Sequence, residues 1–101
     1  MKQITIGRFP FWVPDNDVAA DDCCRVATPV LVGDEYVLEP IRRAGHWPQY
    51  VVDVGGNAGS FAVKVADLFP GAAVLACEPF QELADCYAEN AADLPVRVSL
   101  H

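Results

Sequence analysis

Two acidic residues and the glycine-rich loop between them are the part of this sequence best suited to chemistry. The segment Asp53-Val54-Gly55-Gly56-Asn57-Ala58-Gly59-Ser60 follows one apolar run, and Glu78 follows another. Glycines permit a tight turn and a close approach of a ligand to bare backbone, and the start of a helix offers unpaired N–H groups to an anion. A carboxylate at Glu78 can accept hydrogen bonds from both hydroxyls of a ribose, each contributing about 1.5–3 kcal/mol. The pattern indicates a nucleoside-binding site.

The glycine loop lacks the spacing of the dinucleotide fingerprint G-x-G-x-x-G, because Asn57 and Ser60 stand where that pattern, counted from Gly55, needs glycines. Asp53 would point a negative charge at a pyrophosphate, but it suits a cationic group. S-adenosylmethionine carries an ammonium and a sulfonium beside its adenosine, so Asp53 and Glu78 together favour this ligand over NAD. Each acid alone also has a structural interpretation: Asp53 as a turn-forming or helix-capping carboxylate, Glu78 as a charge at a helix N-terminus.

The elements that must position these residues alternate from residue 50 onward. Apolar runs predict strands over Tyr50–Val54, Ala73–Cys77 and Val96–Leu100. Helical spacing predicts a helix over Ser60–Phe69 and a second helix, opened by Glu78 and Pro79, whose apolar series runs from Phe80 to Ala91. Strands joined by helical crossovers form a parallel sheet, here in the order 3-2-1. The predicted fold class is therefore α/β: the first β-α-β-α-β half of a Rossmann-like fold, with its ligand outside the carboxyl ends of the strands.

Residues 1–49 are expected to form an N-terminal extension or cap, and residues 50–101 the half-domain itself. Prolines make the first stretch irregular, with short strands predicted over Gln3–Ile6 and Pro29–Val32. A helix is predicted over Asp34–Ala44, capped by Asp34 and kinked or started afresh at Pro40. Cys23-Cys24 is expected in a polar loop as free thiols, because its spacing does not suit zinc.

Charge and hydropathy exclude several partners. Seven Lys and Arg against fourteen Asp and Glu give a net charge of −7, so a cationic footprint for nucleic acid is missing. No apolar run approaches the roughly 18 residues of a membrane span, and the N-terminus lacks a signal-peptide core. We expect a cytoplasmic protein with no nucleic-acid or membrane partner.

The motifs resemble those of class I S-adenosylmethionine-dependent methyltransferases, and most closely those of the FkbM family. The matching segments are Val51-Val52-Asp53-Val54-Gly55-Gly56-Asn57-Ala58-Gly59-Ser60-Phe61 and Ala76-Cys77-Glu78-Pro79-Phe80. The family's first motif reads D-V-G-A-N-x-G and its second x-E-P, so Asn57 fits and Gly56 replaces the more frequent alanine. Phe11-Trp12-Val13-Pro14-Asp15 is a weaker upstream likeness.

The resemblance implies S-adenosylmethionine as cofactor. The first motif would cradle its methionine part, Glu78 its ribose, and Pro79 and Phe80 would flank its adenine, although Phe80 also fits the core of a helix. The implied cofactor-binding residues are Asp53, Gly55, Gly56, Asn57, Gly59, Ser60, Glu78, Pro79 and Phe80.

The implied reaction is methyl transfer, with a small-molecule or saccharide hydroxyl as the expected acceptor. No residue is a persuasive base: His46 is expected at the amino end of the first strand, and Tyr50 in the core.

Because family members are much longer than 101 residues, we expect a truncated chain that keeps the cofactor motifs, and whether it is active alone stays open. A non-catalytic interaction module on a methyltransferase scaffold and an NAD-binding oxidoreductase half are the alternatives. An unpaired, apolar edge at Tyr50–Val54 predicts self-association or a partner chain.

Overall fold

A three-stranded parallel sheet with helices on only one of its faces positions the glycine loop. In the computed structural model, which describes residues 1–101, the sheet has the order β3-β4-β5. Its strands are β3 (Tyr50–Val54), β4 (Ala73–Cys77) and β5 (Arg97–Leu100). The helices α3 (Ser60–Leu68) and α4 (Gln81–Ala91) form the crossovers between them. The predicted α/β fold class and strand order are confirmed. The boundaries of the elements differ from the predicted ones by no more than one residue, except that α4 begins at Gln81 and not at Glu78-Pro79.

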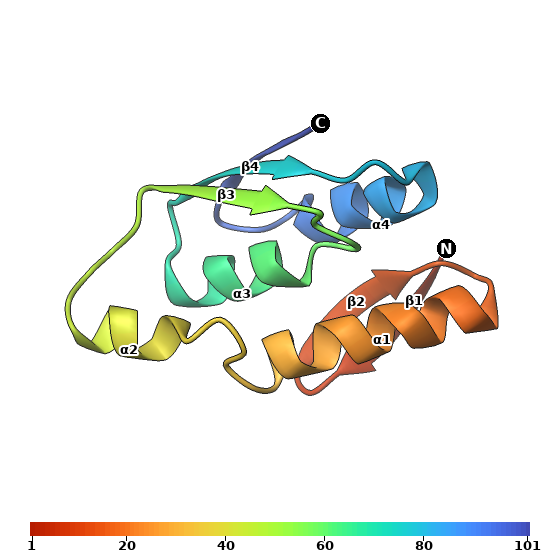
Figure 1. The fold of residues 1–101 in the computed structure, drawn as a ribbon, viewed down its shortest axis with the longest axis horizontal. Coiled ribbons are helices and arrows are strands. Elements are labelled where there is room, and N and C mark those ends of the chain that lie inside the picture. Colours follow the sequence, from red (N-terminus) through yellow and green to blue (C-terminus); the bar gives the residue numbers. More distant parts are fainter.

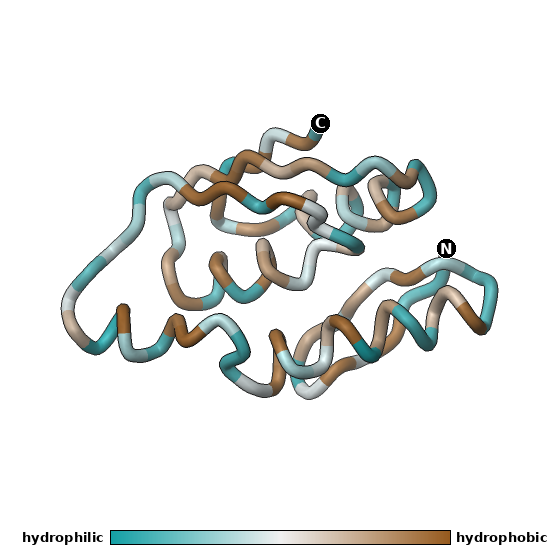
Figure 2. The backbone as a smooth tube through the Cα atoms, viewed as in Figure 1, coloured by the Kyte–Doolittle hydropathy of each residue, from teal (hydrophilic) through white to brown (hydrophobic).

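The two faces of the sheet differ in what covers them. Val74 and Ala76 of β4 are buried in the cluster that β4 forms with α3 and α4, whereas Val52 and Leu75 are exposed. Helices α3 and α4 lie on one side of the sheet, and no helix covers the other (Figure 1). Hydrophobic residues run along β3 and β4 in Figure 2. The prediction of Tyr50 in the core is wrong: its side chain is 78% exposed, because alternate residues of a strand face opposite sides and Tyr50 is on the open one.

The first part of the chain is an antiparallel hairpin followed by a long helix. The hairpin strands are β1 (Lys2–Ile6) and β2 (Phe9–Val13), and the helices are α1 (Asp17–Leu31) and α2 (Leu38–Arg43). The strand predicted over Gln3–Ile6 is confirmed, and β2 was not predicted. Pro10 is tolerated in β2 because a two-stranded sheet consists of edge strands, where a missing N–H costs little.

Two predictions for this region are wrong. Pro29–Val32 is not a strand but the C-terminal end of α1 and the residue after it, and Cys23-Cys24 lies within α1 and not in a loop. The helix begins at a capped N-terminus, where the Asn16 side chain accepts a hydrogen bond from Ala19 N at 3.1 Å. One face of α1 is buried, and this burial offsets the hydrogen bond that Pro29 cannot donate. The buried residues are Ala20, Cys23, Ala27, Val30 and Leu31.

The helix predicted over Asp34–Ala44 is shorter in the structure, and it begins afresh at Leu38. Asp34 does cap it, since its carboxylate accepts hydrogen bonds from Leu38 N at 2.8 Å and Glu39 N at 3.1 Å. Pro40 therefore falls in the first turn of α2, where a missing N–H leaves no intrahelical bond unmade.

Two hydrophobic clusters hold three layers together. One joins β4 to α3 and α4 and includes Phe69, Val74 and Tyr87. The other joins the hairpin and α1 to the far side of α3 and α4, with Phe11 and Val13 among its fully buried members. The hairpin and α1 thus pack on the helices α3 and α4, away from the sheet (Figure 1). None of the four helices combines the length and apolar character that crossing a bilayer requires.

Candidate functional site

The glycine loop folds over the carboxyl end of the parallel sheet. It leaves β3 after Val54, and Gly55 N and Gly56 N both donate hydrogen bonds to Cys77 O, at 2.9 and 3.0 Å. The loop is thereby fastened to the end of the neighbouring strand β4, one residue before Glu78. Asp53 and Glu78 therefore come from adjacent strand ends, and each is only 8% exposed. The structure brings together the two acids that the sequence singled out.

Glu78 holds both the glycine loop and the start of α4. Its Oε1 accepts a hydrogen bond from Asn57 N at 2.8 Å, and its Oε2 accepts one from Phe80 N at 2.9 Å. A carboxylate has about four acceptor sites, so each oxygen can still accept a further hydrogen bond. The side chain is consequently fixed in orientation but not saturated, which is what recognition of a diol requires.

Asp53 is a buried carboxylate without a cation. Its Oδ2 accepts a 2.7 Å hydrogen bond from the Tyr87 hydroxyl. Burial raises the pKa of Asp53, the bond from Tyr87 opposes this, and the nearby Glu78 raises the pKa further. Neither acid belongs to any of the four ion pairs of the structure. The site thus carries negative charge that no side chain of the protein neutralises, and it favours a ligand that brings positive charge.

Tyr87 of α4 packs against two of the glycines in the loop, Gly56 and Gly59. A Cβ added at Gly56 would clash with Tyr87 Cε2, and one added at Gly59 would lie 3.1 Å from the same ring. Gly55 shares a positive φ with Gly59 (+69° and +94°), but it differs in having nothing within 4 Å of an added Cβ. Its backbone faces open space that a ligand can occupy. From the sequence, Tyr87 was predicted only as one apolar position of the helix. Its hydroxyl was the available signal, because a buried tyrosine hydroxyl usually has a hydrogen-bond partner.

Asn90, also on α4, is a second residue that the sequence analysis missed. Its Nδ2 donates to Ala58 O at 2.7 Å and to Trp12 O at 2.9 Å, and its Oδ1 accepts from Trp12 N at 2.6 Å. Asn90 lies in the last turn of α4, and its residue type, which favours a helix little, was the only signal for this role.

The remaining predicted site residues lie around the same edge. Asn57 is left-handed, with φ 52°, and its side chain accepts from Ala58 N at 2.8 Å. Ser60 begins α3 and is buried, and Pro79 is exposed. The helical series suggested a place in the core for Phe80, but this residue precedes the first turn of α4 and is 70% exposed. Asn57 and Phe80 together line a pocket of about 390 Å³ beside α1.

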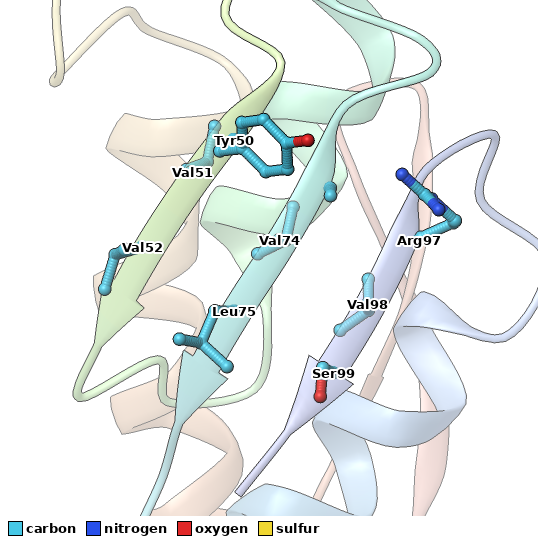
Figure 3. A pocket seen from close by; sticks show the side chains of 9 residues that line it. Tyr50, Val51, Val52, Val74, Leu75, Arg97, Val98 and Ser99 are labelled. Atoms are coloured by element: carbon cyan, nitrogen blue, oxygen red, sulfur yellow. The ribbon is translucent and has the colours of Figure 1, made fainter.

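Other candidate chemistry lies elsewhere. His46 is exposed in the segment between α2 and β3, at the amino end of the sheet, as expected. No three side chains of His, Cys, Asp or Glu are grouped so that they could hold a metal ion. A hollow of about 470 Å³ lies on the open face of the sheet, with Tyr50 and Arg97 on its outer strands (Figure 3). It contains neither acid nor the glycine loop, and so it is separate from the site.

Comparison with known proteins gives partial structural likenesses. No family model matches the chain, and no curated protein matches it. It is similar to the mitomycin 7-O-methyltransferase MmcR, at 23% identity and a TM-score of 0.42 over 80% of this chain and 26% of that one. It is similar to the bifunctional kinase-methyltransferase WbdD, at 25% identity and 0.47 over 82% and 18%. A third likeness is to Thermoplasma acidophilum 1320, at 24% identity and 0.47 over 63% and 36%.

Two of these three proteins are methyltransferases by name. The chain covers 36% of Thermoplasma acidophilum 1320, 26% of MmcR and 18% of WbdD, so it corresponds to well under half of each. The α/β fold itself is given by the parallel sheet and its helical crossovers.

Proposed function

We propose that this chain binds S-adenosylmethionine at the carboxyl edge of its sheet and serves a methyltransferase of the FkbM type. One observation carries the proposal. Asp53 and Glu78 are both buried at neighbouring strand ends, with a glycine loop between them and no cation to neutralise either. A buried carboxylate without a neighbouring cation is costly even when it is hydrogen-bonded, and a cationic nucleoside would remove part of that cost while using both acids.

The residues present fit this cofactor in four respects. Asp53 offers a carboxylate to the ammonium group, and Glu78 offers free acceptor sites to the two ribose hydroxyls. The open space at Gly55 lets the methionine part lie against bare backbone. The exposed ring of Phe80 is free to stack on an adenine.

The cofactor would supply an activated methyl group, so the protein has to position the acceptor and remove its proton. Positioning of this kind is a large source of rate enhancement. The resemblance to the FkbM family supports a hydroxyl of a small molecule or saccharide as acceptor. The pocket beside Asn57 and Phe80 opens next to the proposed cofactor, which supports the approach of an acceptor from the side of α1.

Calorimetric titration with S-adenosylhomocysteine tests the proposal on the chain as it stands. We expect binding by the wild type and about tenfold weaker binding by Glu78→Gln, because one charge-assisted hydrogen bond to the ribose is weakened. Glu35→Gln is the matched control, since Glu35 is exposed and belongs neither to the loop nor to the lining of the pocket beside it; it should bind as the wild type does. NADH should not bind. A folded wild type that fails to bind S-adenosylhomocysteine at millimolar concentration contradicts the proposal.

A further inference from the structure

The hairpin and the glycine loop are far apart in sequence, yet one side chain joins them. Asn90 donates hydrogen bonds to Ala58 O in the loop and to Trp12 O in β2, and accepts one from Trp12 N. A side-chain amide has two donor hydrogens and one carbonyl oxygen. All of these are used, so Asn90 links α4 to both segments at once.

The bonds to Trp12 are those that a neighbouring strand would make. β2 pairs with β1 on one side only, and the N–H and C=O of Trp12 are bonded to Asn90 in place of another strand. Phe11 and Val13, on either side of Trp12, are fully buried against α1 and α4. The hairpin is therefore a firm anchor, and Asn90 is held by it.

The bond to Ala58 acts on the loop. Ala58 is 1% exposed, so without a donor its carbonyl would be buried and unpaired, which is unfavourable. The next residue, Gly59, is left-handed and precedes the first residue of α3. A shift of the Ala58 carbonyl would thus move the backbone that leads from the loop into the helix start.

We infer that Asn90 is a positioning residue of the cofactor site: anchored on the hairpin, it holds the Ala58 carbonyl and so the shape of the glycine loop. The hairpin segment Phe11-Trp12-Val13 then belongs to the site, although none of its side chains has to touch the ligand. The inference rests on the proposed function where it concerns cofactor affinity, but loop order can be measured without any ligand.

Amide hydrogen exchange followed by mass spectrometry, together with titration of S-adenosylhomocysteine, tests it. In Asn90→Ala we expect amides of residues 57–60 to exchange at least about tenfold faster, because a hydrogen bond holding the loop is lost. Amides of β4 should keep their wild-type protection. Affinity for S-adenosylhomocysteine should fall by about tenfold. Glu89→Ala, at the exposed neighbouring position of α4, should match the wild type in both measurements.

Each other outcome also decides the matter. Wild-type exchange in the loop of Asn90→Ala overturns the inference, and so does faster exchange everywhere, since that would make Asn90 a general stabiliser of the fold. If wild-type protein does not bind S-adenosylhomocysteine, the proposed function fails while the exchange result still tests the loop. Asn90→Ser keeps one donor and serves where Asn90→Ala does not fold; it should show the same local pattern to a smaller extent.

Discussion

The Tyr87 hydroxyl donates a 2.7 Å hydrogen bond to Asp53, and this contact joins the middle of α4 to the end of β3. The same aromatic ring is fully buried and lies against Gly56 and Gly59. One residue therefore orients an acid of the proposed site and shapes the loop beside it. It also gives a physical reason for glycine at position 56, where an added Cβ would clash with the ring.

Tyr87→Phe should destabilise the protein. The substitution leaves the ring in place but removes the only side-chain donor that Asp53 has in the structure, and hydrogen bonds to charged groups contribute about 1.5–3 kcal/mol. Urea denaturation should show a lower midpoint with an unchanged slope. Tyr50→Phe is the control, because Tyr50 is exposed on the open face. Equal midpoints for the two variants would contradict the role given to the hydroxyl.

Gly56→Ala should be destabilising through a steric clash with Tyr87, at a cost of about 1–3 kcal/mol for overpacking. Tyr87→Leu removes the ring atoms that the new methyl group meets, so the double variant should lose less stability than the sum of the single changes. The coupling should be in the range of about 0.5–3 kcal/mol. Gly71→Ala provides the comparison: it has φ +92° and nothing within 4 Å of its Cβ. Its cost should be backbone strain alone and should add to that of Tyr87→Leu.

The parallel sheet could be predicted from sequence because its signals are local. Tyr50–Val54 and Ala73–Cys77 are apolar runs bounded by glycine or proline, and the structure has strands over the same residues. The same pattern predicts that Asp53 and Glu78 lie at one site, because both stand at the carboxyl ends of parallel strands, where ligands of such sheets bind.

The rest depends on contacts between distant segments, which no local pattern contains. The local pattern predicts Tyr87 only as an apolar position of a helix, and its hydrogen bond to Asp53 depends on how α4 packs on β3. The local pattern likewise predicts Asn90 only as a helix position, and its bonds to Trp12 depend on the place of β2. Pro29 locally disfavours a helix, yet the burial of Val30 and Leu31 keeps it within α1. At Pro29 tertiary packing outweighs the local preference.

The exposed edge of β3 leads to a prediction about association. β3 has no strand on its outer side, and Tyr50, Val52 and Val54 are all exposed. Without a proline or lysine, such an edge favours pairing with another chain. We expect sedimentation velocity of this 101-residue chain to show concentration-dependent association, and Val52→Lys to reduce it.

Val26→Lys is the matched control, because Val26 is a partly exposed valine on α1; it should associate as the wild type does. A wild type that stays monomeric over the whole concentration range and unfolds in one sharp thermal transition would contradict the prediction.

Asp53→Asn should make the protein more stable at neutral pH while weakening its binding of S-adenosylhomocysteine. The pKa of Asp53 is raised above its ordinary value of 3.8 because burial disfavours the charged form. The folded protein therefore holds the Asp53 proton more tightly than the unfolded chain does. It follows that the cost of the buried charge is absent below about pH 3.8, grows as the pH rises through the raised pKa, and is constant above it. Asparagine never carries this charge and keeps an oxygen for the Tyr87 hydroxyl.

The stability gained by Asp53→Asn, measured by urea denaturation from about pH 3 to about pH 7, should accordingly be small in acid and increase toward neutral pH, by about 1.4 kcal/mol for each unit that the pKa is raised. Asp21→Asn, at an exposed position of α1, should show no such increase. The same Asp53→Asn protein should bind S-adenosylhomocysteine about tenfold more weakly or worse, because the carboxylate for its ammonium group is gone. A gain in stability without a loss of affinity would mean that Asp53 has a structural role only. A gain in stability together with a loss of affinity is expected for a residue that binds the ligand at a cost in stability.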